Sequence, residues 1–333
     1  MTNPLAVTMG EPAGIGGEIT LKTWLARSDD IPPFYVIDDP DRLASLARRL
    51  DWPAVVRAID APDQAVDVFV EALPVMPIGC AIRAQPGRPD PADVPAILSA
   101  IETAVRDVRG GRAAAVVTNP IHKNSLYCAG FRHAGHTEYL AELAGTSQLP
   151  VMMLVCPALR VVPVTIHQAL REAIESLSSA DIVHAGRVTG AALRQDFGIP
   201  TPVLAVAGLN PHAGEAGALG REEIDIIEPA LAELRAAGID ARGPLPPDTM
   251  FNAEARGSYD AALCMYHDQA LIPLKTIDFY GGVNVTLGLP FVRTSPDHGT
   301  AFAIAGRGAA RPDSLIAALR LAAPMAAGRQ AAG

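Results

Sequence analysis

Residues 263–275 read LCMYHDQALIPLK, an apolar run that ends abruptly in His267, Asp268 and Gln269. The run indicates a buried strand whose tip leaves the core at the histidine. Similar short β-branched runs recur along the chain, at 5–10, 34–38, 113–120, 151–155, 159–167, 202–210, 259–267 and 282–289. Apolar residues at helical spacing lie between them, at 93–109, 168–196, 220–237 and 311–327. This alternation predicts an α/β fold with mostly parallel sheets.

Composition limits the class of protein. A chain of 333 residues favours two lobes over one compact core. Its 36 acidic and 27 basic residues give a formal charge of -9, which argues against nucleic acid and anionic membranes as partners. The N-terminus lacks the features of a signal peptide, and prolines interrupt the most apolar segment at 150–166, so we expect a soluble cytoplasmic protein. The four cysteines are scattered, which favours reduced thiols.

Three histidines share one context. His167, His212 and His267 each close a predicted strand, and the carboxyl ends of parallel strands line the ligand-binding edge of an open α/β sheet. Each one alone is more often a structural or surface residue. Together they predict a divalent metal site, because three imidazoles would leave an open coordination position, as in catalytic zinc centres. The three histidines are far apart in the sequence, so their spacing does not support a metal site. The support for this prediction is their common position at the ends of strands.

Other polar residues at similar junctions suit an anionic substrate. His136 and Thr137 precede a helical pattern, where they contact a ligand or cap the helix. Lys275, Asn284 and Arg293 follow or interrupt apolar runs, and an arginine offers a bidentate fork for phosphate or carboxylate. The alternative for each is an ordinary surface residue.

Two glycine-rich stretches do not match a nucleotide-binding motif. Residues 9–18, MGEPAGIGGE, lack the lysine of a P-loop and the G-x-G-x-x-G register. Residues 212–223, HAGEAGALGREE, carry three glutamates that would repel an anion, so we interpret them as a turn that presents His212.

The chain resembles the 4-hydroxythreonine-4-phosphate dehydrogenases of pyridoxal phosphate biosynthesis. The resemblance runs from residue 9 to about residue 308 and rests on MGEPAGIGGE, TNPIHK, GHTEYLA, TIHQAL, LNPHAGEAGALGREE, DTMF, YHDQALIPLK and VNVTLGLPFVRTSPDHGTAFAIAGRG. Four positions depart from the family pattern, namely Gly17, His122, Ala270 and Ala303. None of the four is one of the three strand-end histidines.

The resemblance implies a two-lobed α/β/α fold similar to that of the isocitrate and isopropylmalate dehydrogenases, with the active cleft between the lobes. One lobe would comprise residues 1–135 and 270–333, and a middle lobe, 136–269, would carry metal ligands and dimer contacts. It also implies a homodimer whose active sites are shared between subunits. Each site would hold one divalent metal (zinc, magnesium or cobalt) on His167, His212 and His267, with His267 supplied by the neighbouring subunit. The implied substrate contacts are His136, Thr137, Lys275, Asn284 and Arg293.

The segment 297–314, DHGTAFAIAGRGAARPDS, resembles the adenine-binding loop of the isopropylmalate and isocitrate dehydrogenases. It implies NAD as cofactor, with NADP as an alternative. The implied cofactor contacts are His298, Gly299, Thr300, Ala301 and Ile304.

The hypothesis is a metal-assisted oxidation followed by decarboxylation. The expected substrate is 4-phosphooxy-L-threonine, and the 3-oxo acid formed from it would lose carbon dioxide to give 3-amino-2-oxopropyl phosphate. His167, His212, His267 and Lys275 are the expected catalytic residues, and Asp248 and Asp268 are candidates for the base or for an orienting residue. The alternatives are a related dehydrogenase acting on another phosphorylated or dicarboxylated hydroxy acid, such as 4-phosphoerythronate, and a zinc-dependent lyase or aldolase.

Overall fold

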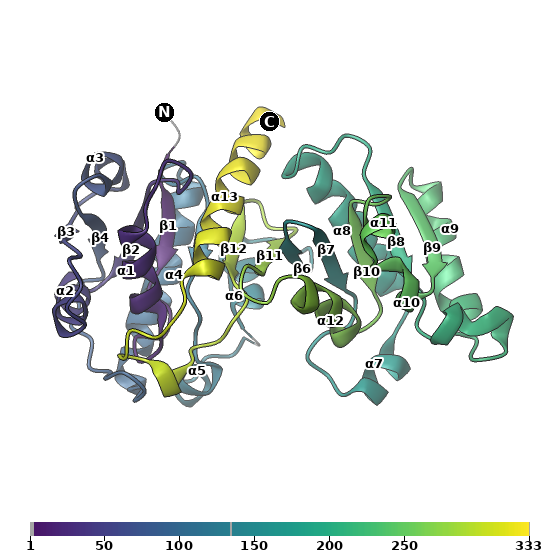
Figure 1. The fold of residues 1–333 in the computed structure, drawn as a ribbon, viewed down its shortest axis with the longest axis horizontal. Coiled ribbons are helices and arrows are strands. Elements are labelled where there is room, and N and C mark those ends of the chain that lie inside the picture. Colours follow the sequence, from purple (N-terminus) through teal and green to yellow (C-terminus); the bar gives the residue numbers. More distant parts are fainter. Residues whose placement is uncertain (1–2, 134, 333) are drawn as a thin grey trace. The chain divides into compact units, whose positions relative to one another are not determined.

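A computed structural model describes residues 3–133 and 135–332 (Figure 1). It divides into two compact units, and each is described by itself. Unit 1 contains the residues up to 149 together with 289–331, and unit 2 contains residues 150–288. Both units combine helices with a sheet of mostly parallel strands, which confirms the predicted α/β class. Among the described residues, no helix has both the length and the apolar composition that a membrane span requires.

Unit 1 is built on parallel strands. Their order is β3-β4-β2-β1-β5-β12, and every strand pair recorded within this unit is parallel. The strands are β1 (Leu5–Thr8), β2 (Phe34–Asp38), β3 (Val56–Ala58), β4 (Leu73–Pro77), β5 (Val116–Thr118) and β12 (Arg293–Pro296). The two central strands β1 and β2 are buried along their whole length, as expected for strands covered on both faces.

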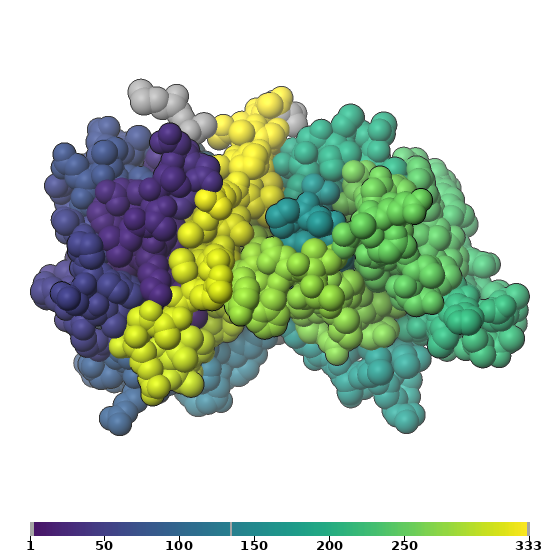
Figure 2. Space-filling model, in the orientation of Figure 1, coloured from purple at the N-terminus to yellow at the C-terminus, as the bar shows by residue number. Residues whose placement is uncertain are grey.

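Helices cover the sheet of unit 1. They are α1 (Gly16–Leu25), α2 (Pro40–Arg49), α3 (Ala65–Phe69), α4 (Val94–Arg109), α5 (Lys123–Cys128), α6 (His136–Ala144) and α13 (Asp313–Ala332), with 3₁₀ turns η1 (Pro62–Gln64), η2 (Pro91–Asp93) and η5 (Phe302–Ile304). Helix α4 packs against β1, β2 and β5, and its buried stripe includes Ile97 and Ile101. Figure 2 shows α13, in yellow, on the surface of one face of the molecule.

Unit 2 mixes parallel and antiparallel pairing. Its strand order is β11-β6-β7-β10-β8-β9, in which β6 runs antiparallel to both neighbours and the remaining pairs are parallel. The strands are β6 (Val151–Cys156), β7 (Leu159–Pro163), β8 (Val203–Ala207), β9 (Asp240–Leu245), β10 (Ala261–Cys264) and β11 (Val283–Leu287). The parallel set β7, β10 and β8 therefore ends at one edge of the sheet.

The helices of unit 2 include two short irregular segments. The regular ones are α7 (Leu170–Ser176), α8 (Ser179–Gln195), α9 (Glu228–Ala236), α10 (Pro247–Met250), α11 (Ala253–Arg256) and α12 (His267–Ile277). The irregular ones are η3 (Pro211–Gly217) and the π-helical turn η4 (Glu223–Ile227). Helix α9 begins beside Pro229, where the sequence suggested a kink or a new segment.

The unit boundaries differ from those expected from the sequence. Residues 136–149, expected in the middle lobe, belong to unit 1, because Tyr139, Leu140 and Ala144 are buried in the same core cluster as α4. Residues 270–288, expected in the terminal lobe, belong to unit 2. There Ala270 and Leu274 of α12 join the core cluster of β7 and β10, and β11 pairs with β6.

Candidate functional site

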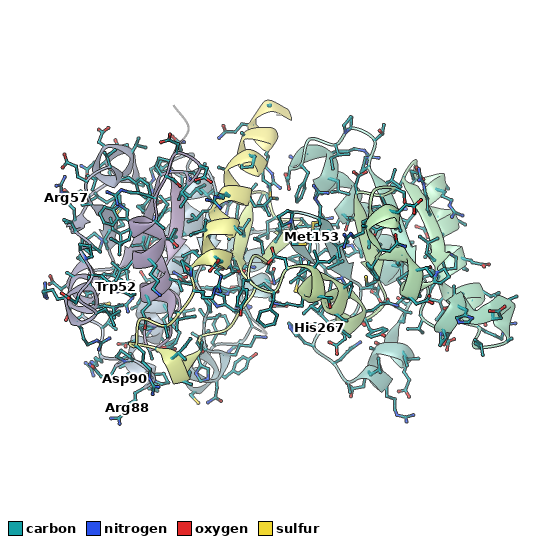
Figure 3. All side chains as sticks on the ribbon, viewed as in Figure 1. Trp52, Arg57, Arg88, Asp90, Met153 and His267 are labelled. Atoms are coloured by element: carbon teal, nitrogen blue, oxygen red, sulfur yellow. The ribbon has the colours of Figure 1, made fainter. Side chains whose placement is uncertain are left out.

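The three strand-end histidines follow three neighbouring strands of unit 2. His167 lies four residues beyond β7, His267 begins α12 just after β10, and His212 lies in η3 after β8. Since these strands are parallel neighbours, all three histidines belong to the same edge of the sheet. His267 is the first residue of a helix rather than the last of a strand, and Figure 3 places it at the start of α12.

His167 and His267 form a close pair within one chain. Their ring centroids are 5.9 Å apart, with the ring planes inclined by 42°. Two imidazoles bound to one cation through metal–nitrogen bonds of about 2.0–2.1 Å have ring centres roughly 5–6 Å apart. A cavity of about 540 Å³ adjoins the pair, and its lining includes Thr165, Glu172, Tyr266 and Asp268. The geometry of this pair suits a divalent metal.

His212 does not complete a metal centre within the chain. No three histidine, cysteine, aspartate or glutamate side chains among residues 3–133 and 135–332 gather closely enough to hold a metal ion.

The backbone around His212 has an uncommon conformation. Residues 212–216 all have positive φ, from 43° at Glu215 to 79° at Gly214, so the segment is a short left-handed turn. Each non-glycine residue in this region costs roughly 1–2 kcal/mol. Buried Glu223 holds the turn: its carboxylate accepts hydrogen bonds from the backbone N–H groups of Leu209 and Asn210, both 2.7 Å. His167 also has positive φ, at 51°.

Carboxylates lie beside Nδ1 of two of the histidines. Asp268 Oδ1 is 2.7 Å from Nδ1 of His267, and Glu215 Oε2 is 3.3 Å from Nδ1 of His212. Metal-binding histidines commonly have such a partner on the ring nitrogen that does not touch the metal. The donor set of unit 2 thus fits an imidazole-bound divalent cation.

The other residues predicted in unit 2 lie on separate elements. Lys275 is in the last turn of α12, about 12 Å along the helix axis from His267. Its ammonium lies over the ring of Phe279, 5.5 Å from the centroid. Asn284 is in β11, opposite Leu154 of β6. Asp248 is exposed on the short helix α10, which packs beside η3 and therefore near the turn that carries His212.

Unit 1 holds a cluster of cationic and neutral nitrogen groups. Arg293, at the start of β12, is only 4% exposed, and its guanidinium donates to Thr118 Oγ1 through Nη2 at 2.6 Å and Nε at 3.2 Å. Burial lowers the pKa of Arg293 to about 10. Burial, followed by the charges of Arg293 and Lys123, holds the pKa of His136 well below its usual value, so this imidazole is neutral at pH 7.

His136 and Thr137 open α6 and do not cap it. The N-cap residue is Gly135, and no side chain bonds to the cap. Nε2 of His136 is buried and has no hydrogen-bond partner among the described residues. Lys123 adds a charge that the sequence analysis missed: its Nζ lies 3.6 Å from where a Cβ on Gly135 would stand. With the positive end of α6, these groups form a site suited to an anion.

The segment 297–314, which is predicted to bind a nucleotide, is hydrogen-bonded to residues 15–22 of unit 1. The carbonyl of Thr300 accepts a hydrogen bond from the backbone N–H of Ile15 at 3.0 Å. The buried carboxylate of Glu18 accepts from the N–H groups of Gly306 and Gly308. The ammonium of Lys22 donates to the carbonyls of Gly308 and Ala310, at 2.7 and 2.6 Å.

The predicted cofactor contacts form the outer part of this loop. Space around Gly299 is open, Ala301 adopts the left-handed conformation, and Ile304 is 37% exposed at the end of η5. Nδ1 of His298 lies 3.1 Å from the carbonyl of Gly299. The open side of the loop leaves these residues accessible to a ligand, and their role in cofactor binding stays a prediction.

Comparison with known proteins identifies the family to which this chain belongs. The family model described as pyridoxal phosphate biosynthetic protein PdxA matches residues 30–322. The chain belongs to the PdxA family. A PdxA relative from Bradyrhizobium diazoefficiens, named 4-hydroxythreonine-4-phosphate dehydrogenase, is 58% identical over 98% of both chains. Another of the same name, from Caulobacter vibrioides, is 55% identical over 98% of this chain and 99% of its own.

A solved PdxA structure extends the agreement to the fold. The crystal structure of 4-hydroxythreonine-4-phosphate dehydrogenase from Klebsiella pneumoniae is 39% identical to this chain, with a TM-score of 0.87. The match covers 98% of this chain and 100% of that one. The family resemblance read from the sequence motifs is confirmed.

Sequence reasoning missed several residues that shape these sites. Glu18 and Lys123 were not singled out, and Glu215 and Glu223 were interpreted only as charges that would repel an anion, although each lies in a stretch that carries the family resemblance. A signal existed for Lys123, which follows the carboxyl end of β5 much as the histidines follow their strands. No comparable signal marks Glu223, because its role depends on a turn that is fixed only in the folded chain.

Proposed function

We propose that this chain is a NAD- and metal-dependent 4-hydroxythreonine-4-phosphate dehydrogenase. It oxidises the secondary alcohol of 4-phosphooxy-L-threonine by transferring hydride to NAD and releasing a proton. The resulting 3-oxo acid loses carbon dioxide to give 3-amino-2-oxopropyl phosphate. The observation that carries the proposal is 58% identity, over 98% of both chains, to a relative of that name. The close His167–His267 pair supplies independent support.

The histidines are the proposed metal ligands. A bound divalent cation (zinc, magnesium or cobalt) would act as a Lewis acid that polarises the substrate oxygen and stabilises the negative charge that develops there. His267 would hold it through Nε2, because its Nδ1 faces Asp268, and His167 would contribute a second ring nitrogen. Lys275, Asn284 and Asp248 keep their predicted roles as substrate contacts and candidate base.

The cluster of unit 1 is the proposed anchor for the anionic groups of the substrate. Arg293 offers a guanidinium fork, and His136 presents a buried ring nitrogen at the N-terminus of α6. Thr137, the second residue of α6, lies beside them, and Lys123 adds charge. These groups orient the reacting carbon by fixing the phosphate or carboxylate of the substrate.

A homodimer would supply the third metal ligand. The family resemblance assigns His267 to the neighbouring subunit; because His167 and His267 lie together in one chain, we propose His212 as the alternative residue that the partner subunit supplies. Exposed apolar residues on α12 and the turn after it favour such an interface: Ile272 and Phe279 are each 64% exposed, and Tyr280 is 51% exposed. A surface of this kind is typical of a protein–protein contact.

The loop held by Glu18 is the proposed site for the nucleotide, with NADP as the alternative to NAD. Replacing Glu18 with alanine removes the acceptor for two backbone N–H groups and should loosen the loop. We expect the KM for NAD to rise about tenfold, with a smaller change in the KM for substrate. Steady-state kinetics with each substrate varied in turn would measure this.

A matched control for Glu18 is Glu71→Gln, which removes an exposed acid of unit 1 that pairs with Arg57. This variant should behave as the wild type. If Glu18→Ala folds normally and both KM values are unchanged, the loop does not bind the nucleotide.

The direct test of the proposed function is a substrate panel. Purified protein with NAD and a defined divalent metal should form reduced nicotinamide and carbon dioxide from 4-phosphooxy-L-threonine. Turnover with 4-phosphoerythronate alone would favour a related dehydrogenase. Cleavage of a phosphorylated hydroxy acid to an aldehyde without NAD would favour the lyase.

A further inference from the structure

Two of the histidines assigned to metal binding repeat one local arrangement. A carboxylate that is close in sequence lies against Nδ1 in each case, Glu215 for His212 and Asp268 for His267. An ionised carboxylate can only accept a hydrogen bond, so Nδ1 of the neutral imidazole must carry the proton. The unprotonated lone pair is then on Nε2, the nitrogen left available to bind a cation.

The left-handed turn produces the first of these pairs. Glu215 follows His212 by three residues, and the left-handed backbone of residues 212–216 brings the two side chains together. His212 and Glu215 are 67% and 62% exposed, and an exposed ion pair contributes little to stability. The pair therefore returns little of the free energy that the strained backbone costs.

Buried Glu223 keeps this arrangement in place. Besides the two backbone N–H groups, it accepts a hydrogen bond from Nδ2 of Asn210 at 2.9 Å. A Cβ on Gly214 would stand 2.5 Å from Glu223 Oε2, so the turn packs directly on the carboxylate. The fold thus maintains a strained turn, and the effect of this turn is to orient the side chain of His212.

We propose that Glu215 is a positioning residue for His212. Its carboxylate fixes the Nδ1–H tautomer and the ring orientation, so that Nε2 is presented to a divalent cation. Asp268 does the same for His267. The inference rests on the proposed function, because it assigns both histidines to the metal.

The test is metal affinity in the full-length protein. Metal-free protein is titrated with Co²⁺, followed by calorimetry and by the visible absorption of the bound ion. Glu215→Ala should weaken Co²⁺ binding about tenfold or more, the usual effect of losing such a partner. Alanine leaves the backbone demand at this position unchanged, since neither residue is glycine. Glu215→Gln, which keeps an acceptor but loses the charge, should lie between alanine and wild type.

The matched control is Asp225→Asn. Asp225 is an exposed acid in the same region, and it pairs with Arg221 at 2.8 Å. This variant should bind Co²⁺ as the wild type does. It separates a specific effect of Glu215 from a general loss of negative charge near the site.

A second measurement excludes a purely structural role for Glu215. Nitrogen-15 NMR of the metal-free protein reports which ring nitrogen of His212 carries the proton. The wild type should show the Nδ1–H tautomer, and Glu215→Ala should shift the population toward Nε2–H. Equal Co²⁺ affinity in Glu215→Ala and wild type, or an Nε2–H tautomer in the wild type, would overturn the inference. Absence of Co²⁺ binding by the wild type would instead contradict the proposed function.

Discussion

Mixed dimers of a His167→Ala chain and a His212→Ala chain are expected to recover activity that neither variant has alone. If His167 and His267 of one subunit meet His212 of the other, such a dimer contains one intact set of three ligands. Coexpression with two affinity tags would isolate the mixed dimers for assay. One of their two sites is intact, so the isolated mixed dimers should reach about half of wild-type turnover, and an unfractionated random mixture about a quarter.

The matched control pairs His167→Ala with His267→Ala. Both residues lie in the same subunit of each proposed site, where their rings are 5.9 Å apart, so no combination restores a full set. We expect no recovery. The opposite pattern, with recovery only in this control, would show that His267 is the residue exchanged between subunits. Recovery in neither mixture would place all three ligands in one chain or remove the shared site.

The single variants set the baseline for this experiment. Each histidine-to-alanine change should lower turnover by a factor of at least about 10³, because a three-ligand site loses its cation readily when one ligand is missing. Chelation of the wild type should have the same effect, and added Zn²⁺ or Co²⁺ should reverse it. Full turnover in the presence of excess chelator would refute the metal assignment.

Arg293→Met is expected to lower kcat/KM for the substrate by a factor on the order of 10² to 10³ while leaving the KM for NAD unchanged. Arg293 is 4% exposed, and Nε and Nη2 of its guanidinium donate to Thr118 Oγ1, in the cluster that includes His136. Charge-assisted bidentate contacts are the strongest hydrogen bonds a side chain makes to phosphate or carboxylate. Methionine fills similar space but offers neither charge nor donor.

Stability distinguishes loss of binding from loss of folding in this variant. Burial lowers the pKa of Arg293 to about 10, because the charged guanidinium loses its hydration in the folded state. Burial of this charge therefore costs folding free energy at neutral pH. Removing the charge should therefore leave the free energy of unfolding equal or higher. Exposed Arg320→Met, which breaks a surface pair with Asp30, is the control for both measurements. An unchanged substrate dependence in Arg293→Met would exclude its role as an anchor.

The sequence carries enough information to predict the fold class and to assign His167, His212 and His267 to one edge of a sheet. Parallel strands place their carboxyl ends at one edge, so residues that follow separate apolar runs can be assigned to a common region. Strands β3, β4, β9 and β12 escaped prediction: β3 has only 3 residues, the LPVMP sequence of β4 contains prolines, and β9 and β12 are polar. Residues 293–296, RTSP, and 240–245, DARGPL, contain no apolar alternation that would mark them.

A turn at 212–216 was predicted, but its left-handed conformation could not be, for a physical reason. Consecutive left-handed residues oppose the intrinsic preference of every L-amino acid in the segment, so no local propensity points to them. Their conformation follows from Glu223 and from the close packing of Gly208 on Ala213. The lobe boundaries expected from the sequence also differ from the boundaries of the two units. The reason is that the sequence does not show against which of the two cores the apolar faces of α6 and α12 pack.

The left-handed turn also implies a trade-off between the stability of the fold and the activity of the protein. Glycine adopts positive φ at little cost, so an exchange of Ala213 or Ala216 for glycine would relieve strain locally. The same substitution would allow the His212 side chain to adopt orientations in which Nε2 is not presented to the cation. Selection for thermal stability alone would thus favour glycine in this turn. Such a conflict is expected where a strained conformation lowers folding stability but orients a functional side chain.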